Sequence, residues 1–423
     1  MAIGNIKDGP LTGVRVVDLT GVLAGPFATK LLADMGAEVI KVEPLEVGAA
    51  ERHMPLIVDR EGVKQSGYSV FLNRGKKSLS VNLKDAKGLE IVKKLIKKSD
   101  VLVENFSPGA LNRLGLGYED VAKINPKMIY CSISCFGHYG PYSDLPGYDI
   151  IAQGASGWTG MSDPPIIAPV SIGDMTASTH ATTAILSALY YREKKGVGQC
   201  IDISMMDCLF HLHENVPQWY FFSGRKTKVI SIGRLHPGYA PYGVYRGQDG
   251  FIVIAALSDA IWQRLVEAMG KESEWLLSDQ RTKCQEVRCT IENAPLVHRI
   301  LEEWISRFKS VREVERVLSA SKVPAFRVRS IEELADDPHI RAREMIVRMK
   351  QPFVGEIEVY GCPLKMNKTP TGVRGHAPLI GENTREVLSK VLDYDSETIN
   401  GFYAEGIVYS EPAVERLEKE LSN

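Results

Sequence analysis

The first half of the chain alternates short apolar runs with longer amphipathic segments. The apolar runs are rich in valine and isoleucine, which is typical of buried strands. Residues 86–100 instead repeat leucine and isoleucine at helical spacing between lysines, which predicts an amphipathic helix. The runs that we interpret as strands are residues 13–20, 38–43, 76–83, 101–106 and 128–137. Strands that alternate with helices predict a doubly wound α/β domain with a parallel sheet.

The pattern changes after about residue 225. Residues 240–256 are typical of two strands around a Gln-Asp-Gly turn, and three amphipathic segments follow. This mixture predicts a second, smaller α+β domain at about residues 230–322. Beyond it, the pattern predicts a strand and two helices, and residues 376–392 end in a C-terminal helix.

The composition of the chain limits the kinds of molecule that it is expected to bind. The chain has 423 residues, of which 44% are hydrophobic and 24% charged, and its formal net charge is −1. A balanced charge gives no general attraction for nucleic acid or an anionic membrane, so we expect neither as a partner. The sequence shows no apolar signal segment and no apolar run long enough to span a bilayer, so we expect a cytoplasmic protein. Seven cysteines without metal-ligand spacing favour reduced thiols and no metal site.

Motif searches exclude several kinds of active site. No GxGxxG follows the first strand, and the chain has neither a Walker A loop nor a GxSxG elbow. A bare carboxylate therefore becomes a candidate nucleophile, since it can attack an activated acyl group. Asp174 in "SIGDMTASTH" is that candidate, directly after Gly173 and before a helix expected at 176–191. The alternative is that Asp174 only caps this helix, which is a common use of aspartate.

Several motifs in order resemble one known family. They include "LTGVRVVDLTGVLAGPFATKLLADMGAEVIKVE", "NRGKKSLSVNLK", "SDVLVENFSPGALNRLGLGYE", "IGDMTAS", "GVGQCIDISMMD" and "PLIGENTREVL". The chain resembles the class III coenzyme A transferases, the family of formyl-CoA transferase, carnitine CoA-transferase and α-methylacyl-CoA racemase. The resemblance runs from Leu11 nearly to the C-terminus.

The resemblance implies a catalytic aspartate and a set of coenzyme A contacts. Asp174 matches the family's nucleophile, which forms mixed-anhydride and aspartyl-CoA thioester intermediates. A carboxylate is expected to be deprotonated at pH 7 without a neighbouring base. The substrate would be a coenzyme A thioester, with no tightly bound cofactor. Residues that match coenzyme A contacts are Val22, Leu23, Ala24, Asn105, Phe106, Arg113 and Met205.

Two groups of polar residues are candidates for the phosphates of coenzyme A. Asn105 and Arg113 lie near one another in the sequence, so together they favour a phosphate contact. Lys41, Lys76 and Lys77 are further candidates with less support from the motifs.

The resemblance also implies the architecture. We expect a large Rossmann-like domain built from residues 1–200 and 323–423, a linker at 201–225, and an inserted small α+β domain at 226–322. Members of the family form a dimer of two interlocked rings. The partner would be a second copy of this chain or a paralogous chain.

Departures from the family pattern bear on the substrate. Leu23 stands where formyl-CoA transferase has glutamine, which predicts an acceptor bulkier and more apolar than oxalate, with succinyl-CoA as donor. Tyr148 stands where the racemases have an acid/base histidine, which disfavours racemisation. The glycine loop of relatives has its nearest counterpart at residues 233–243. A racemase, and one subunit of a heteromeric transferase, remain the alternatives.

Overall fold

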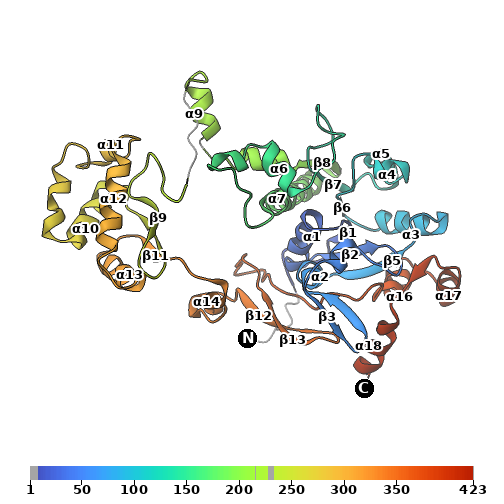
Figure 1. Ribbon diagram of the computed structural model, residues 1–423. Coiled ribbons are helices and arrows are strands. Elements are labelled where there is room, and N and C mark those ends of the chain that lie inside the picture. Colours follow the sequence, from blue (N-terminus) through green and yellow to red (C-terminus); the bar gives the residue numbers. More distant parts are fainter. Residues whose placement is uncertain (1–7, 215, 227–232, 423) are drawn as a thin grey trace. The chain divides into compact units, whose positions relative to one another are not determined.

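The computed structural model describes residues 8–214, 216–226 and 233–422 (Figure 1). The chain divides into two compact units, which are described separately. Unit 1 comprises Met1–Ser156, Ala168–Leu212 and Pro338–Asn423, and unit 2 comprises Gly157–Ile167 and His213–Asp337. The domain limits predicted from the sequence stay a prediction. No helix among the described residues has the length and apolar character needed to cross a membrane.

Unit 1 is built on a seven-stranded sheet in the order β14-β5-β2-β1-β6-β7-β8. All neighbouring strands are parallel except β14, which pairs antiparallel with β5. The strands are β1 Arg15–Leu19, β2 Glu38–Glu43, β5 Lys77–Val81, β6 Val101–Glu104, β7 Ile129–Ser134, β8 Gln199–Ser204 and β14 Val408–Tyr409. The predicted α/β architecture with a mostly parallel sheet is therefore confirmed.

The strand order reverses direction at β1. The chain builds outward from β1 through β2 to β5, and then returns to β6 on the other side of β1. In open α/β sheets, ligands bind outside the carboxyl ends of the strands at such a switch point. The segments that follow β1 and β6 therefore lie where a site is expected.

Helices cover both faces of this sheet. On one face, α3 and α5 pack with the C-terminal helical segments around a core that includes Leu79, Ile91, Leu102 and Leu388. On the other, α1 packs against α7, and α7 against β7 and β8. The helical elements of unit 1 are α1 Ala24–Asp34, η1 Ala50–His53, α2 Gly67–Asn73, α3 Ala86–Lys97, α4 Ala110–Arg113, α5 Tyr118–Ile124, α6 Asp149–Ala155, α7 Ile172–Lys195, α8 Met205–His211, α15 Pro338–Ala342, α16 Thr384–Glu386, η4 Val387–Val391, α17 Ser396–Ala404 and α18 Pro412–Ser422.

Unit 1 also contains two hairpins that the hydrophobic pattern did not predict. They are β3 Ile57–Arg60 with β4 Val63–Ser66, and β12 Ile346–Gln351 with β13 Gly355–Tyr360. Strand β14 was also not predicted. These strands are short or solvent-facing, so they lack the continuous apolar runs that marked the central strands.

Unit 2 has its own sheet and core. Its sheet has the order β11-β10-β9, with antiparallel pairing throughout. Tyr245, Ile252, Trp262 and Leu301 are among the buried residues that join the sheet to its helices. The elements are η2 Thr159–Met161, α9 Val216–Phe222, β9 Tyr242–Arg246, β10 Phe251–Ala255, α10 Asp259–Met269, η3 Lys271–Leu277, α11 Gln285–Arg288, α12 Ala294–Ile305, α13 Val311–Ala320, β11 Ala325–Arg327 and α14 Ile331–Ala335.

Candidate active site

Asp174 lies inside the first turn of α7 and does not cap the helix. The helix begins at Ile172, earlier than predicted, and its N-cap residue is Ser171. The cap is supplied by Asp149 of α6, whose Oδ1 accepts the backbone N–H groups of Gly173 at 2.6 Å and of Asp174 at 3.1 Å. The alternative that Asp174 serves only as the helix cap is therefore wrong.

Gly173 is required by the close approach of Asp149. A Cβ atom at this position would lie 2.8 Å from Oδ1 of Asp149 and 3.2 Å from the side chain of Leu209. Any larger residue would push the capping carboxylate away from the helix end. The packing of α6 and α8 against the start of α7 therefore leaves room only for glycine before Asp174.

The Asp174 carboxylate has an unusual electrostatic environment. Burial, with a further contribution from the negative charge of Asp149, raises the pKa of Asp174 from 3.8 to about 7. Among the residues that the structure describes, none donates a hydrogen bond to this carboxylate. The expectation of full deprotonation at pH 7 is therefore wrong for the protein without substrate, because nothing nearby compensates the buried charge.

Two further ionisable side chains belong to this region. Burial raises the pKa of Tyr68 to about 12, and the charge of Asp174 adds to the effect. Burial also raises the pKa of the Cys135 thiol to about 11, again with Asp174 and Asp149 contributing. Tyr68 in α2 and Cys135 after β7 therefore stay neutral beside the carboxylate and cannot act as charged groups near pH 7.

A serine connects Asp174 to the turn between β1 and α1. The hydroxyl of Ser178, one helical turn after Asp174, lies 2.6 Å from the carbonyl oxygen of Ala24 and 2.6 Å from that of Asp174. Ala24 is the first residue of α1, and Leu23 before it is buried. The structure therefore brings the predicted nucleophile and the predicted contacts of the first turn together.

Asn105 belongs to the same region but its amide is already occupied. Its Oδ1 accepts the N–H of Gly21 at 2.9 Å, and its Nδ2 donates to the carbonyl of Gly21 at 2.8 Å. The residue thus joins the end of β6 to the end of β1 at the switch point. The amide of Asn105 therefore holds the turn, and its predicted contact with coenzyme A stays a prediction.

The other predicted coenzyme A contacts lie around this centre with different exposure. The Phe106 ring is 40% exposed, and its backbone N–H donates to Glu104. Arg113 is exposed at the end of α4. Met205 is buried at the start of α8, where Ser204 donates to the carbonyl of Cys135. No described contact joins Arg113 to Asp174, so its part in binding stays a prediction.

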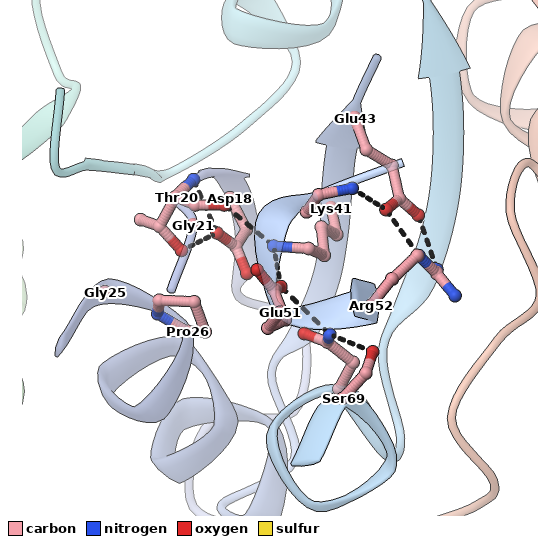
Figure 2. A network of polar contacts seen from close by, with 12 residues as sticks. Asp18, Thr20, Gly21, Gly25, Pro26, Lys41, Glu43, Glu51, Arg52 and Ser69 are labelled. Atoms are coloured by element: carbon pink, nitrogen blue, oxygen red, sulfur yellow. Dashed lines mark hydrogen bonds and ion pairs between the residues drawn. The ribbon is translucent and has the colours of Figure 1, made fainter. Parts of the chain in front are cut away.

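The lysines named as further phosphate candidates are engaged inside the protein. Lys41 is fully buried and pairs with Glu51 at 2.9 Å, and Lys76 pairs with Asp18 at 2.9 Å (Figure 2 shows the Lys41 contact). Lys77 is half-buried. Its Nζ lies 2.8 Å from Oε1 of Glu38 and 3.1 Å from Oε1 of Glu386 in the C-terminal region. The hypothesis that Lys41 and Lys76 contact phosphates is therefore wrong, because neither ammonium reaches solvent.

Sequence reasoning missed two residues of this site. Asp149 directly follows Tyr148 in the sequence, and an acid at the start of a short helix was a usable signal. Tyr68 carried no local signal, because only the tertiary fold brings α2 to α7. Tyr148 itself is the N-cap of α6, and its ring is 72% exposed.

Comparisons with known proteins identify the family of this chain. The model of CoA-transferase family III matches residues 11–384. The chain is 35% identical over 391 residues to a succinate–glutarate CoA-transferase of Agrobacterium fabrum, covering 90% of this chain and 96% of the relative. It is 33% identical over 405 residues to a succinyl-CoA–D-citramalate CoA-transferase of Chloroflexus aurantiacus, covering 94% and 98%.

A solved structure shows the same fold. The crystal structure of a CAIB/BAIF family protein from Brucella suis matches with a TM-score of 0.79 and 31% identity, covering 91% of this chain and all of that one. The chain therefore belongs to CoA-transferase family III.

Proposed function

We propose that this family III CoA-transferase moves coenzyme A from succinyl-CoA to a second carboxylic acid, with Asp174 as the nucleophile. The observation that carries the proposal is the Asp174 carboxylate itself, half-buried and without a hydrogen-bond donor among the described residues. A carboxylate with a raised pKa is a stronger nucleophile than an ordinary one, because no partner stabilises its charge.

The first half of the reaction loads coenzyme A onto the protein. An oxygen of the Asp174 carboxylate attacks the thioester carbonyl carbon, the carbon–sulfur bond breaks, and coenzyme A leaves as a thiolate. This gives a mixed anhydride between Asp174 and the donor acid. The thiolate then attacks Cγ of Asp174, and the donor acid leaves as a carboxylate. The product is an aspartyl-CoA thioester.

The second half repeats these steps with the acceptor acid. The acceptor carboxylate attacks Cγ of Asp174, and coenzyme A leaves as the thiolate. This gives a new mixed anhydride between Asp174 and the acceptor acid. The thiolate attacks the acceptor's acyl carbon, and the Asp174 carboxylate is released. No net proton is taken up or lost, so the reaction requires no separate acid or base. Tyr68 and Cys135, neutral at pH 7, are consistent with such a site.

We assign the binding of coenzyme A to the segments at the switch point. Val22 and Leu23 form the turn that precedes α1, and Ala24 begins the helix. The backbone amides of Leu23 and Ala24 have no acceptor among the described residues, whereas that of Val22 donates to Glu51. Such amides are suited to a developing oxyanion or a phosphate. Asn105 acts by holding this turn, and Phe106, Arg113 and Met205 extend the proposed surface.

The substrates are inferred from the relatives and from Leu23. The two transferases reported above carry succinate or succinyl-CoA in their names, with glutarate and D-citramalate as the second acid. Leu23 adds an apolar side chain where a glutamine would favour oxalate. We propose succinyl-CoA as donor and a dicarboxylic acid larger than oxalate as acceptor.

We also propose that the active form is an interlocked dimer, with a second copy or a paralogue. Apolar side chains exposed on α6, such as Ile150 and Ile151, support a partner surface. In unit 2, Phe221 and Phe222 on α9 are exposed as well. Analytical ultracentrifugation should show a dimer at nanomolar concentration, and an active monomer would contradict the proposal.

The test of the reaction is a substrate panel. Purified protein is incubated with succinyl-CoA and glutarate, citramalate, mesaconate or oxalate, and the thioesters are identified by mass spectrometry. Hydroxylamine added during turnover should convert Asp174 to a hydroxamate, since it captures the activated carbonyl. Transfer without any modification of Asp174 would exclude the covalent route, and a preference for oxalate would contradict the assigned acceptor.

A further inference from the structure

The turn between β1 and α1 holds one residue in a conformation that its side chain disfavours. Val22 has a φ of 68°, and β-branched residues rarely occupy the left-handed region. Such a backbone persists only where its surroundings hold it, and it often marks a functional site. The amides of Leu23, Ala24 and Gly25 follow at once and find no acceptor among the described residues.

Glu51 is the residue that holds the Val22 amide. Its Oε2 accepts the N–H of Val22 at 3.1 Å, and its Oε1 accepts Nζ of Lys41 at 2.9 Å and Nδ2 of Asn73 at 3.1 Å. Figure 2 shows Glu51 beside Lys41, with Gly21 nearby. An ion pair with Lys41 would need only one carboxylate oxygen. The second oxygen is used on the strained turn.

Lys41 supports the same turn from a second side. Its Nζ donates to the carbonyl of Thr20 at 2.8 Å, while its charge pairs with Glu51. Asn105 holds Gly21 between these two contacts. Two consecutive peptide groups, Thr20–Gly21 and Gly21–Val22, are therefore held by side chains from other segments, and Glu51 holds the N–H that belongs to the strained residue.

We propose that Glu51 is a positioning residue for coenzyme A, acting through Val22. Its carboxylate holds Val22 in the left-handed conformation, and this aims the free amides of the next residues at the thioester or a phosphate. The inference rests on the proposed function, since it takes the β1–α1 turn as part of the coenzyme A site. Glu51 itself is fully buried, so it acts on coenzyme A only through the turn.

Glu51→Gln tests this role because an amide cannot replace both oxygens. If its single carbonyl oxygen accepts from the Val22 amide, its NH₂ group faces the donors of Lys41 and Asn73. If the oxygen accepts from Lys41 and Asn73 instead, the NH₂ group faces the Val22 amide. We expect the Kd of coenzyme A, measured by calorimetry, to rise about tenfold or more. Unchanged affinity would overturn the proposal.

Val22→Gly supplies the discriminating background. Glycine adopts a φ of 68° without strain, so the turn then depends less on Glu51. We expect Glu51→Gln to raise the Kd about threefold or less in this background. An equal loss in both backgrounds would show that Glu51 acts through stability alone, and would also overturn the proposal.

Asp34→Asn is the matched control. Asp34 is a buried acid at the far end of α1, paired with Lys30 at 2.8 Å and Arg74 at 3.3 Å, and it does not contact the turn. We expect this variant to lose stability and keep the Kd of coenzyme A; a comparable rise in Kd would overturn the specific role of Glu51.

Glu51→Asp covers a failure of Glu51→Gln to fold. It retains a charge beside Lys41 but is one methylene too short to reach both donors, so the same loss of affinity is expected and its absence would overturn the proposal. The proposed function fails separately, if wild-type protein neither binds coenzyme A nor transfers it. Binding by wild type and Glu51→Gln alike would refute only the inference about Glu51.

Discussion

Two aspartates of unit 1 lie in opposite electrostatic environments. Asp18, below the β1–α1 turn, is fully buried, and burial alone would raise its pKa; Lys41, Lys76 and two hydroxyl donors instead hold the pKa of Asp18 well below its usual range. Asp174, in the first turn of α7, is half-buried, and the charge that adds to the effect of burial on its pKa comes from another acid, Asp149. One residue type therefore takes opposite electrostatic states within one unit.

This difference distinguishes an aspartate that stabilises the fold, Asp18, from the proposed nucleophile, Asp174. Every oxygen of Asp18 accepts a hydrogen bond, so its charge is satisfied and it stabilises the segment after β1. The Asp174 carboxylate, with no donor among the described residues, keeps the basicity that a nucleophile requires. Five predictions would break or sharpen this contrast, from the largest expected effect to the smallest.

The largest effect is expected from Asp174→Asn. The amide matches the carboxylate in shape but cannot form the mixed anhydride, so kcat for transfer should fall at least about 10³-fold. Circular dichroism should show an unchanged fold. Transfer at the wild-type rate by freshly purified variant, checked by mass spectrometry for deamidation, would contradict the proposed nucleophile.

Asp18→Asn should act on stability instead. It leaves Lys76 fully buried without its acid, and breaking such a pair costs about 3–5 kcal/mol. Denaturant unfolding followed by fluorescence measures the loss. The control is Glu90→Gln, because Glu90 forms an exposed pair with Lys93 and should change the free energy of unfolding by about 1 kcal/mol or less. Equal values for the two variants would remove the contrast.

The sequence predicted the features of the fold and the site that depend on local pattern. Alternating strands and helices predicted the parallel sheet, because buried parallel strands are continuous apolar runs. The motif around Asp174 identified the candidate nucleophile through the family resemblance, and the small residues after it predicted most of α7. Val22, Leu23 and Ala24 were identified through the same resemblance, and in the structure they lie at the junction of the β1–α1 turn and α1.

The remaining parts depend on contacts between distant residues. Asp149 caps α7 from 24 residues away, and no helical or strand period links the two positions. Lys41 and Lys76 had the appearance of surface cations in the sequence, because burial of a lysine depends on acids such as Asp18 and Glu51 folding against it. The raised pKa of Asp174 has the same origin, since it follows from tertiary burial.

A third prediction uses pH and stability. The pKa of Asp174 is about 7 in the folded protein and near 3.8 when exposed, so between these values the folded state holds a proton that the unfolded state has lost. Stability from this group is therefore present at low pH and falls as pH rises from about 4 to 7.

Asp174→Asn lacks this titration. Its stability relative to wild type should increase from pH 5 to pH 8, on the order of 1–2 kcal/mol, because screening reduces the roughly 4 kcal/mol that the full difference in pKa represents. Thermal midpoints across this range measure the change. A constant difference between the two proteins would show that Asp174 is ionised in the folded protein at pH 5.

A fourth prediction concerns Asp149. Asp149→Asn keeps an oxygen for the amides of Gly173 and Asp174 but removes the charge that adds to the effect of burial on the pKa of Asp174. The rise of kcat/KM with pH should move to lower pH, on the order of one unit. Asp149→Ala is the comparison, since it also removes the cap and should cost about 1 kcal/mol in stability. An unmoved pH profile in Asp149→Asn would assign the raised pKa to burial alone.

The smallest effect is expected from Ser178→Ala, which removes the contact between the two regions. The Ser178 hydroxyl lies 2.6 Å from the carbonyls of Ala24 and Asp174, and one neutral hydrogen bond contributes about 1 kcal/mol. Ser187→Ala is the matched control, because Ser187 bonds only the carbonyl of Thr183 in the same helix.

We expect Ser178→Ala to lower kcat/KM by about fivefold or less, and Ser187→Ala to leave it unchanged. Combined with Asp18→Asn, the loss of stability should be additive within about 0.5 kcal/mol, as for sites without a shared partner. A strong coupling between Ser178 and Asp18 would mean that the supporting network reaches α7 through this serine. The two aspartates would then belong to one cooperative unit, and their opposite pKa values could not be varied separately.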